Sequence, residues 1–95
     1  MIIKGTTKSG IKFQLDSRIK DDTRLLFLMT TAQKTDDAMK ASGALGTLLS
    51  LIFGSDDKVM EFMNEVADKH KGICSAKDMI TELSDMLEAI NAKNS

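Results

Sequence analysis

The stretch Ala44–Phe53 (ALGTLLSLIF) is the most apolar segment of the 95-residue chain and contains no charged residue. A stretch of this length is too short to cross a bilayer, which requires about 20 residues. Because a helix that is apolar nearly all round is usually enclosed, we predict a central helix here. At helical spacing the small residues around this stretch fall on one stripe, which consists of Gly43, Gly46, Thr47, Ser50 and Gly54.

The stripe of small residues would allow another backbone to approach closely, either from the same molecule or from a second copy. Interior glycines each cost a helix roughly 1 kcal/mol relative to alanine, so packing must hold the segment helical. Two interpretations remain open at this point. The helix is enclosed in the core, or part of its surface is kept for a partner.

The composition, with 42% hydrophobic and 28% charged residues, is that of a globular domain and not of a disordered chain. Residues 1–24 carry a net charge of +3 and the remainder carries −4. This polarity can orient head-to-tail contacts but is too weak to imply DNA binding. The single cysteine excludes an internal disulfide, and no charged-then-apolar leader is evident, so we expect a cytoplasmic protein.

The pattern along the chain predicts a predominantly helical α+β fold in a single domain, 1–95, with an N-terminal β-hairpin followed by about four α-helices. Residues 2–7 and 11–15 flank the turn-forming tripeptide Lys8-Ser9-Gly10, which predicts a hairpin over 2–15. A polar connector, 16–20, should lead to a helical body over 21–91 and a frayed tail. Capping residues and apolar spacing place the helices at about 21–33, 35–54, 55–71 and 75–91.

Three Asp-Asp pairs, at 21–22, 36–37 and 56–57, raise the question of a metal site or an acid–base pair. Every pair falls where a helix is expected to begin. Carboxylates at that position satisfy free backbone N–H groups and the positive end of the helix dipole. We therefore predict that the pairs are caps.

His70 and Cys74 are the remaining candidates for a nucleophile with its base, or for half a zinc site. Gly72 lies between them and should end the helix that would align them, and no second Cys or His completes a zinc set. We predict a helix-terminal role for His70 and a packing role for Cys74, with no catalytic, cofactor or metal site. The chain also lacks a basic recognition helix and a strongly cationic amphipathic helix, so we expect neither nucleic acid nor membrane binding.

The order of several loose motifs spans nearly the whole chain and resembles that of a known family, the short tail assembly chaperones of long-tailed (siphovirus-type) phages of Gram-positive bacteria. The motifs are Thr7–Asp16 (TKSGIKFQLD), Asp21-Asp22 before Leu25-Leu26, Leu51–Gly54 (LIFG) before a charged helix, and Gly72–Ser75 (GICS) before an amphipathic helix that leads to Lys93-Asn94-Ser95.

The resemblance implies a non-enzymatic protein that binds the tape measure protein, keeps it soluble and helps recruit tail tube subunits. It also implies that a longer product of ribosomal frameshifting accompanies this chain. As a chaperone, the protein would act in the host cytoplasm during infection and be absent from the mature virion. Self-association into a homo-oligomer is left open by the charge polarity and by the stripe of small residues.

A tape measure protein is long and helical, so its chaperone needs an adaptable apolar groove, which methionine-rich helix faces provide. We expect this groove to use the central helix and the third helix. The expected anchors are Met60, Phe62 and Met63, with contributions from Leu49, Ile52 and Phe53. Two alternatives remain open: a small structural subunit of the finished tail, and a regulatory adaptor that binds a host protein or an operator.

Overall fold

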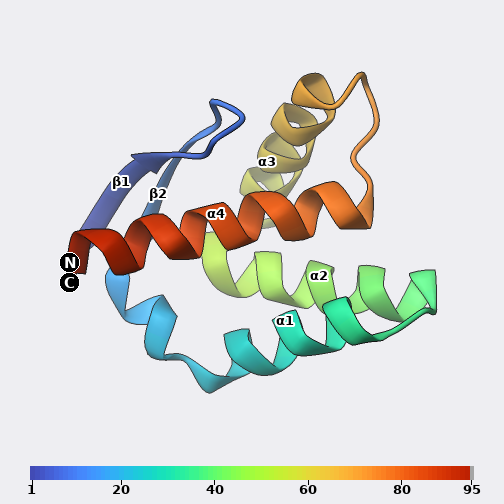
Figure 1. Cartoon of the computed structure of the whole chain (residues 1–95), viewed down its shortest axis with the longest axis horizontal. Coiled ribbons are helices and arrows are strands. Elements are labelled where there is room, and N and C mark those ends of the chain that lie inside the picture. Colours follow the sequence, from blue (N-terminus) through green and yellow to red (C-terminus); the bar gives the residue numbers. More distant parts are fainter. Residues whose placement is uncertain (95) are drawn as a thin grey trace.

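The computed structural model describes the backbone of residues 1–94 and the side chains through Asn91. It confirms a predominantly helical α+β fold in which a β-hairpin precedes four α-helices over residues 1–94 (Figure 1). The elements are β1 (Ile2–Thr6), β2 (Lys12–Asp16), the 3₁₀ helix η1 (Ser17–Asp21), α1 (Thr23–Lys34), α2 (Ala38–Phe53), α3 (Asp56–Lys69) and α4 (Ala76–Asn94).

The hairpin forms because its side chains alternate between an apolar and a polar face. β1 and β2 pair antiparallel, with Ile3 opposite Leu15 and Gly5 opposite Phe13. Ile3, Phe13 and Leu15 are buried against the helices. The alternation also predicts which hairpin side chains face water, and all of these are exposed: Lys4, Thr6, Lys12 and Gln14.

Gly5 has a specific steric role in this hairpin. The Phe13 ring lies over it, so a Cβ atom added at Gly5 would approach the Cζ atom of Phe13 to 2.6 Å. Real Cβ contacts are longer than this, and Phe13 is only 6% exposed, so it has little room to move. The close contact between the glycine and the ring therefore fixes how β1 and β2 pack on each other.

Acidic and hydroxyl side chains begin the helices, as the sequence predicts. The carboxylate of Asp22 accepts a hydrogen bond from the backbone N–H of Arg24 at the start of α1. Asp37 does the same for α2, and Ser55 caps α3, with the third Asp-Asp pair lying in its first turn. Capping is therefore confirmed for the first two Asp-Asp pairs, in which the second aspartate, Asp22 or Asp37, is the cap. At the third Asp-Asp pair the cap is Ser55.

Two sequence-based boundaries are wrong. The expected polar connector is the 3₁₀ helix η1, because the side chain of Asp16 accepts a hydrogen bond from the backbone N–H of Arg18 and starts a helical turn. The helical body also continues past residue 91, since α4 extends to Asn94. Ser95, the last residue of the expected tail, lies outside the described residues.

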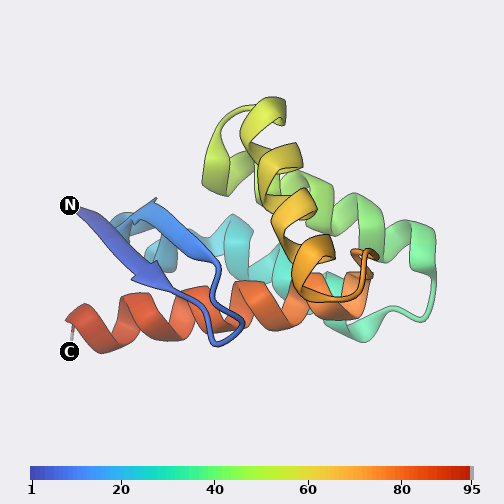
Figure 2. The same ribbon diagram turned by 90° about the horizontal axis from the view of Figure 1, so that it is seen from above.

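The core lies where the four α-helices meet the inner face of the hairpin (Figures 1 and 2). Both views place α1 beside α2, and α3 crosses on the other side of α2. α4 runs beneath the hairpin, so β1 begins and α4 ends at the same end of the molecule. The side chains with no exposed surface include Leu48 and Leu49 of α2, Val66 of α3 and Ile90 of α4.

α1, α3 and α4 all pack on α2 but leave most of the stripe of small residues uncovered, so the interpretation of an enclosed helix is wrong for this stripe. Gly43, Thr47 and Ser50 of this stripe are exposed. Among the described residues, no atom beyond the helix's own backbone and the adjacent residues lies within 4 Å of a Cβ built at Gly43 or at Gly46. The internal packing of the described chain therefore gives these glycines no close neighbour.

Within residues 1–94, no single helix is both long enough and apolar enough to cross a membrane. Only α2 and α3 taken together have the necessary length and apolar character, and they meet at an angle of 114°.

Replacing Gly5 with alanine should destabilise the protein, by about 1–3 kcal/mol, because the added methyl group overpacks against the Phe13 ring. The matched control is Gly43→Ala, for which the structure leaves open space. We expect this control to stabilise the protein by about 0.5–1 kcal/mol through helix propensity. Urea unfolding of both variants measures the difference, and equal stabilities would contradict the described contact between the strands.

Candidate partner-binding surfaces

The six predicted partner-binding residues do not share one surface. Leu49 has no exposed surface and Phe62 is 5% exposed, so neither is available as an anchor in this conformation. The physical reason is helical spacing: Phe62 lies on the same face of α3 as the buried Val59 and Val66. The expectation that Leu49 and Phe62 offer apolar surface to a partner is therefore wrong for this folded state.

The other four predicted residues lie in different surroundings. Phe53 packs its ring on Phe62, with ring centroids 5.0 Å apart and planes at 37°, and this pair holds the corner between α2 and α3. Ile52 is half-buried and packs against the core. Met63 lines a small cavity of about 130 Å³ between α2, α3 and α4. Met60 alone of the six is largely exposed, at 54%.

A groove of about 330 Å³ runs between β2 and α3, and we call it the β2–α3 groove. Its floor contains Phe53 and Phe62 of the predicted set, together with Phe13. The sides of the groove carry charges of both signs, from lysine and glutamate side chains. Since Phe13 and Phe62 are almost fully buried, the groove offers little apolar surface to a partner. Its lining is completed by Lys12, Gln14, Lys58, Glu61 and Glu65.

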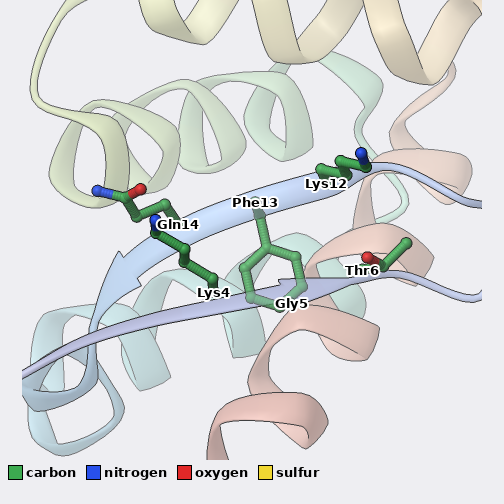
Figure 3. Close-up of a pocket in the computed structure, with 6 residues that line it drawn as sticks. All are labelled: Lys4, Gly5, Thr6, Lys12, Phe13 and Gln14. Atoms are coloured by element: carbon green, nitrogen blue, oxygen red, sulfur yellow. The ribbon is translucent and has the colours of Figure 1, made fainter.

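A second depression, of about 510 Å³, lies over the hairpin and is shown in Figure 3. Its lining combines the exposed Lys4, Thr6, Lys12 and Gln14 with the contact between Gly5 and Phe13. This is the water-facing side of the strands that the alternating pattern predicts.

A third depression lies between α1 and α2, and we call it the α1–α2 hollow. Its volume is about 440 Å³. The adjacent side chains Leu26 and Phe27 of α1 are 56% and 71% exposed, which is unusual for large apolar groups next to each other. The hollow is lined by Thr23, Arg24, Phe27, Leu28 and Thr47.

Sequence reasoning overlooked Phe27, although a signal was present. The buried residues of α1 are Leu25, Met29 and Ala32, which follow helical spacing. Phe27 does not fit that spacing and must project elsewhere. An aromatic residue outside the apolar stripe of an amphipathic helix is therefore the feature that indicates this surface.

A polar cluster joins the hairpin turn, the end of α3 and the middle of α4. Glu82 of α4 has no exposed surface. Its Oε2 atom accepts a hydrogen bond of 2.5 Å from the hydroxyl of Ser9 and lies 3.3 Å from Nε2 of His70. On its other side the His70 ring places Nδ1 3.5 Å from Oδ1 of Asp78. The predicted position of His70 at a helix end is confirmed, because it is the C-terminal cap of α3.

The environment of Glu82 affects its charge in two opposing ways. Burial raises the pKa of the carboxyl group, but the nearby hydroxyls of Ser9 and Thr7 and the His70 ring outweigh this effect and lower the pKa below its ordinary value of 4.5. The Oε1 atom of Glu82 is buried without a hydrogen-bond partner among the described residues. The carboxylate is therefore held ionised as a link between three segments of the chain.

The arrangement of this cluster differs from that of an activated nucleophile. The hydroxyl of Ser9 donates to Glu82 and not to the imidazole of His70. A serine nucleophile would instead require a base positioned to take its proton. The geometry is thus that of a structural clasp, in which the turn of the hairpin is fastened to α4.

Cys74 is half-buried and packs against the core, as predicted. Burial raises the pKa of its thiol, and the nearby Asp78 raises it further. Since the thiolate is the nucleophilic form, these surroundings disfavour the reactive form of Cys74. Within residues 1–94, no group of three or more His, Cys, Asp and Glu side chains is placed to hold a metal ion.

The clasp should make stability depend on pH through Glu82. The pKa of Glu82 is lower in the folded protein than its unfolded value of 4.5. The contribution of the Glu82 carboxylate to the free energy of unfolding is therefore present above the unfolded pKa, and it is lost as the pH falls through the folded pKa. We expect Glu82→Gln to be less stable than the natural protein at about pH 7, and the gap to narrow at about pH 3. Urea unfolding at both pH values measures the gap.

The matched control for this measurement is Glu88→Gln on the same helix, where the carboxylate is 71% exposed and lies 3.9 Å from the ammonium group of Lys8, whose side chain is 79% exposed. We expect Glu88→Gln to change the free energy of unfolding little at either pH. If the difference in unfolding free energy between the natural protein and Glu82→Gln stayed the same or grew in acid, that result would contradict the clasp.

Comparisons with known proteins identify no relative of this chain. No protein-family model matches the chain, and neither a curated protein nor a solved structure matches it.

Proposed function

We propose that this chain is a tail assembly chaperone of a long-tailed phage, which binds the tape measure protein, keeps it soluble and helps recruit tail tube subunits. The observation that carries the proposal is the amount of large apolar surface that this small domain leaves on its helices. Leu26, Phe27, Met39 and Met60 are each between 54% and 84% exposed. Leu26 and Phe27 are adjacent, and adjacent exposed apolar side chains of this size are typical of protein-binding surfaces.

A chaperone for a long helical partner must hold apolar helix faces until they assemble. Helix-in-groove binding achieves this by placing the apolar face of a helix against a hydrophobic surface. Flexible methionine side chains adapt to many partner sequences, and Met39 and Met60 are available for this purpose. The α1–α2 hollow adds a shaped apolar depression beside Phe27.

The order of motifs also supports the proposal, since it resembles the tail assembly chaperones over nearly the whole chain. In keeping with that role, we propose that the protein acts in the host cytoplasm and leaves before the virion is complete. A longer frameshifted form of the same chain would share the folded domain described above.

The proposal is tested by co-expressing the tape measure protein of the same phage with and without this chain. We expect the chain to raise the soluble fraction of the tape measure protein several-fold, because apolar helix faces are covered instead of associating with each other. A matched control co-expresses the tape measure protein with an unrelated helical domain of similar size. An unchanged soluble fraction, with the chain itself folded, would contradict the proposal.

Mass spectrometry of purified virions separates the chaperone from a structural tail subunit. We expect the chain to be absent from virions and present in lysates of infected cells. A constant number of copies in every virion would instead identify a structural subunit of the tail.

A further inference from the structure

The main chain of β2 is open along one edge. The described residues form a sheet of two strands, so β2 has a neighbouring strand on one side only. In an antiparallel pair, alternate residues direct their N–H and C=O groups toward the partner strand, and the residues between them direct these groups away from it. The N–H of Thr7 donates to the C=O of Ile11, which identifies these two residues as a hydrogen-bonded pair.

The register of the hairpin then gives the direction of the other main-chain groups of β2. Phe13, opposite Gly5, belongs to the next hydrogen-bonded pair. Lys12 and Gln14 alternate with these positions, so their N–H and C=O groups point to the open edge. Within residues 1–94, neither N–H donates to a main-chain carbonyl of another element. No proline interrupts the strand, so both donors are present at this edge.

The β2–α3 groove lies beside these free groups. The hairpin residues that line it, Lys12, Phe13 and Gln14, all belong to β2, so the groove is on the side of β2 away from β1. An extended segment placed there would pair with β2 at the usual strand spacing of about 4.8 Å. Strand addition of this kind takes its affinity from main-chain hydrogen bonds. It therefore suits a groove that exposes little apolar surface.

The surroundings of the groove determine the side-chain pattern of its occupant. Successive side chains of a strand point to opposite faces. One set would face the aromatic floor, which contains the half-buried Phe53, and is favoured to be apolar. The other set would lie beside the exposed side chains of Lys12 and Gln14 and is favoured to be polar. The occupant is thus an extended segment in which apolar and polar residues alternate.

The wall formed by α3 limits the occupant further. Its exposed side chains at the groove are Lys58, Glu61 and Glu65, which carry both signs of charge and select no net charge. A second copy of this chain could pair β2 with β2 only by bringing its own α3, which flanks the same edge, against the first α3. The groove therefore suits a single extended segment and not the hairpin of another copy.

We propose that the β2–α3 groove binds an extended segment of a partner protein by adding it to β2 as a third strand. This site goes beyond the proposed function, because it recognises a main chain and not apolar helix faces. Its test therefore does not involve the tape measure protein.

The site is tested with a synthetic peptide of about six residues, a usual strand length, in which valine and threonine alternate. NMR of the natural protein at millimolar peptide measures binding and amide exchange. We expect exchange at Lys12 and Gln14 to slow about tenfold or more, because their N–H groups gain partners. Exchange at Phe13 should change little, since its N–H is already paired with Gly5.

The peptide itself provides a matched control for main-chain recognition. Only one of its two alternate sets of N–H groups faces β2. N-methylation of that set should abolish binding, and N-methylation of the other set should not. Equal binding of the two methylated peptides would contradict strand addition.

A pair of variants tests the same edge from the side of the protein. Gln14→Pro removes a free N–H, and proline is tolerated at a strand edge where the N–H makes no ladder bond. Gln14→Ala removes the side chain and keeps the N–H. We expect Gln14→Pro to weaken peptide binding about tenfold or more and Gln14→Ala to bind normally.

Each other outcome overturns the site. Equal binding by Gln14→Pro and the natural protein would exclude the main chain of β2, and protection confined to α1 and α2 would move the peptide elsewhere. Absence of binding at millimolar peptide would exclude the groove as a strand site. Protection of Lys12 and Gln14 by dimer formation without peptide would assign the edge to a second copy. Thermal unfolding identifies misfolded variants, and the methylated peptides preserve the test if Gln14→Pro does not fold.

Discussion

The burial of α2 against α1, α3 and α4 is the constraint on which the rest of the structure depends. Leu48 and Leu49 have no exposed surface, and burying each such side chain contributes about 1.5–3 kcal/mol. The opposite side of the helix carries glycine, serine and threonine, which have too little apolar surface to attract another element. α1 packs beside α2 but leaves Gly43, Thr47 and Ser50 exposed, and Phe27 of α1 lines a hollow together with Thr47. The packing that builds the core therefore leaves an open stripe of small residues beside an exposed aromatic ring.

The hairpin is attached to this body by its buried apolar side chains and by a polar contact. Ile3, Phe13 and Leu15 belong to the core, and the hydroxyl of Ser9 fastens the turn to the buried Glu82 of α4. A two-stranded sheet has little stability of its own, so both attachments are needed to keep it in place. Because Glu82 also meets His70 at the end of α3, the clasp connects the hairpin to two helices at once.

Local patterns in the sequence predicted the elements of this fold well, and long-range contacts account for what they missed. Alternation assigned the faces of the hairpin, and Asp22 and Asp37 marked helix starts because capping involves neighbours in the sequence. Ser9 and Glu82 are 73 residues apart, so no local pattern indicates their contact. The site was predicted poorly for a related reason. α2 is apolar nearly all round, so periodicity could not decide which side would be buried, and Leu49 was assigned to the surface.

The central expectation of the proposed function is that the partner covers the apolar side chains that α1 and α2 leave exposed, above all Phe27. Amide hydrogen exchange of the natural chain, measured with and without bound tape measure protein, tests this most directly because it reports protection along the whole backbone. We expect slower exchange in the part of α1 around Phe27 and in the part of α2 from Gly43 to Ser50. Slower exchange confined to α3 and β2, with α1 and α2 unchanged, would contradict the claim.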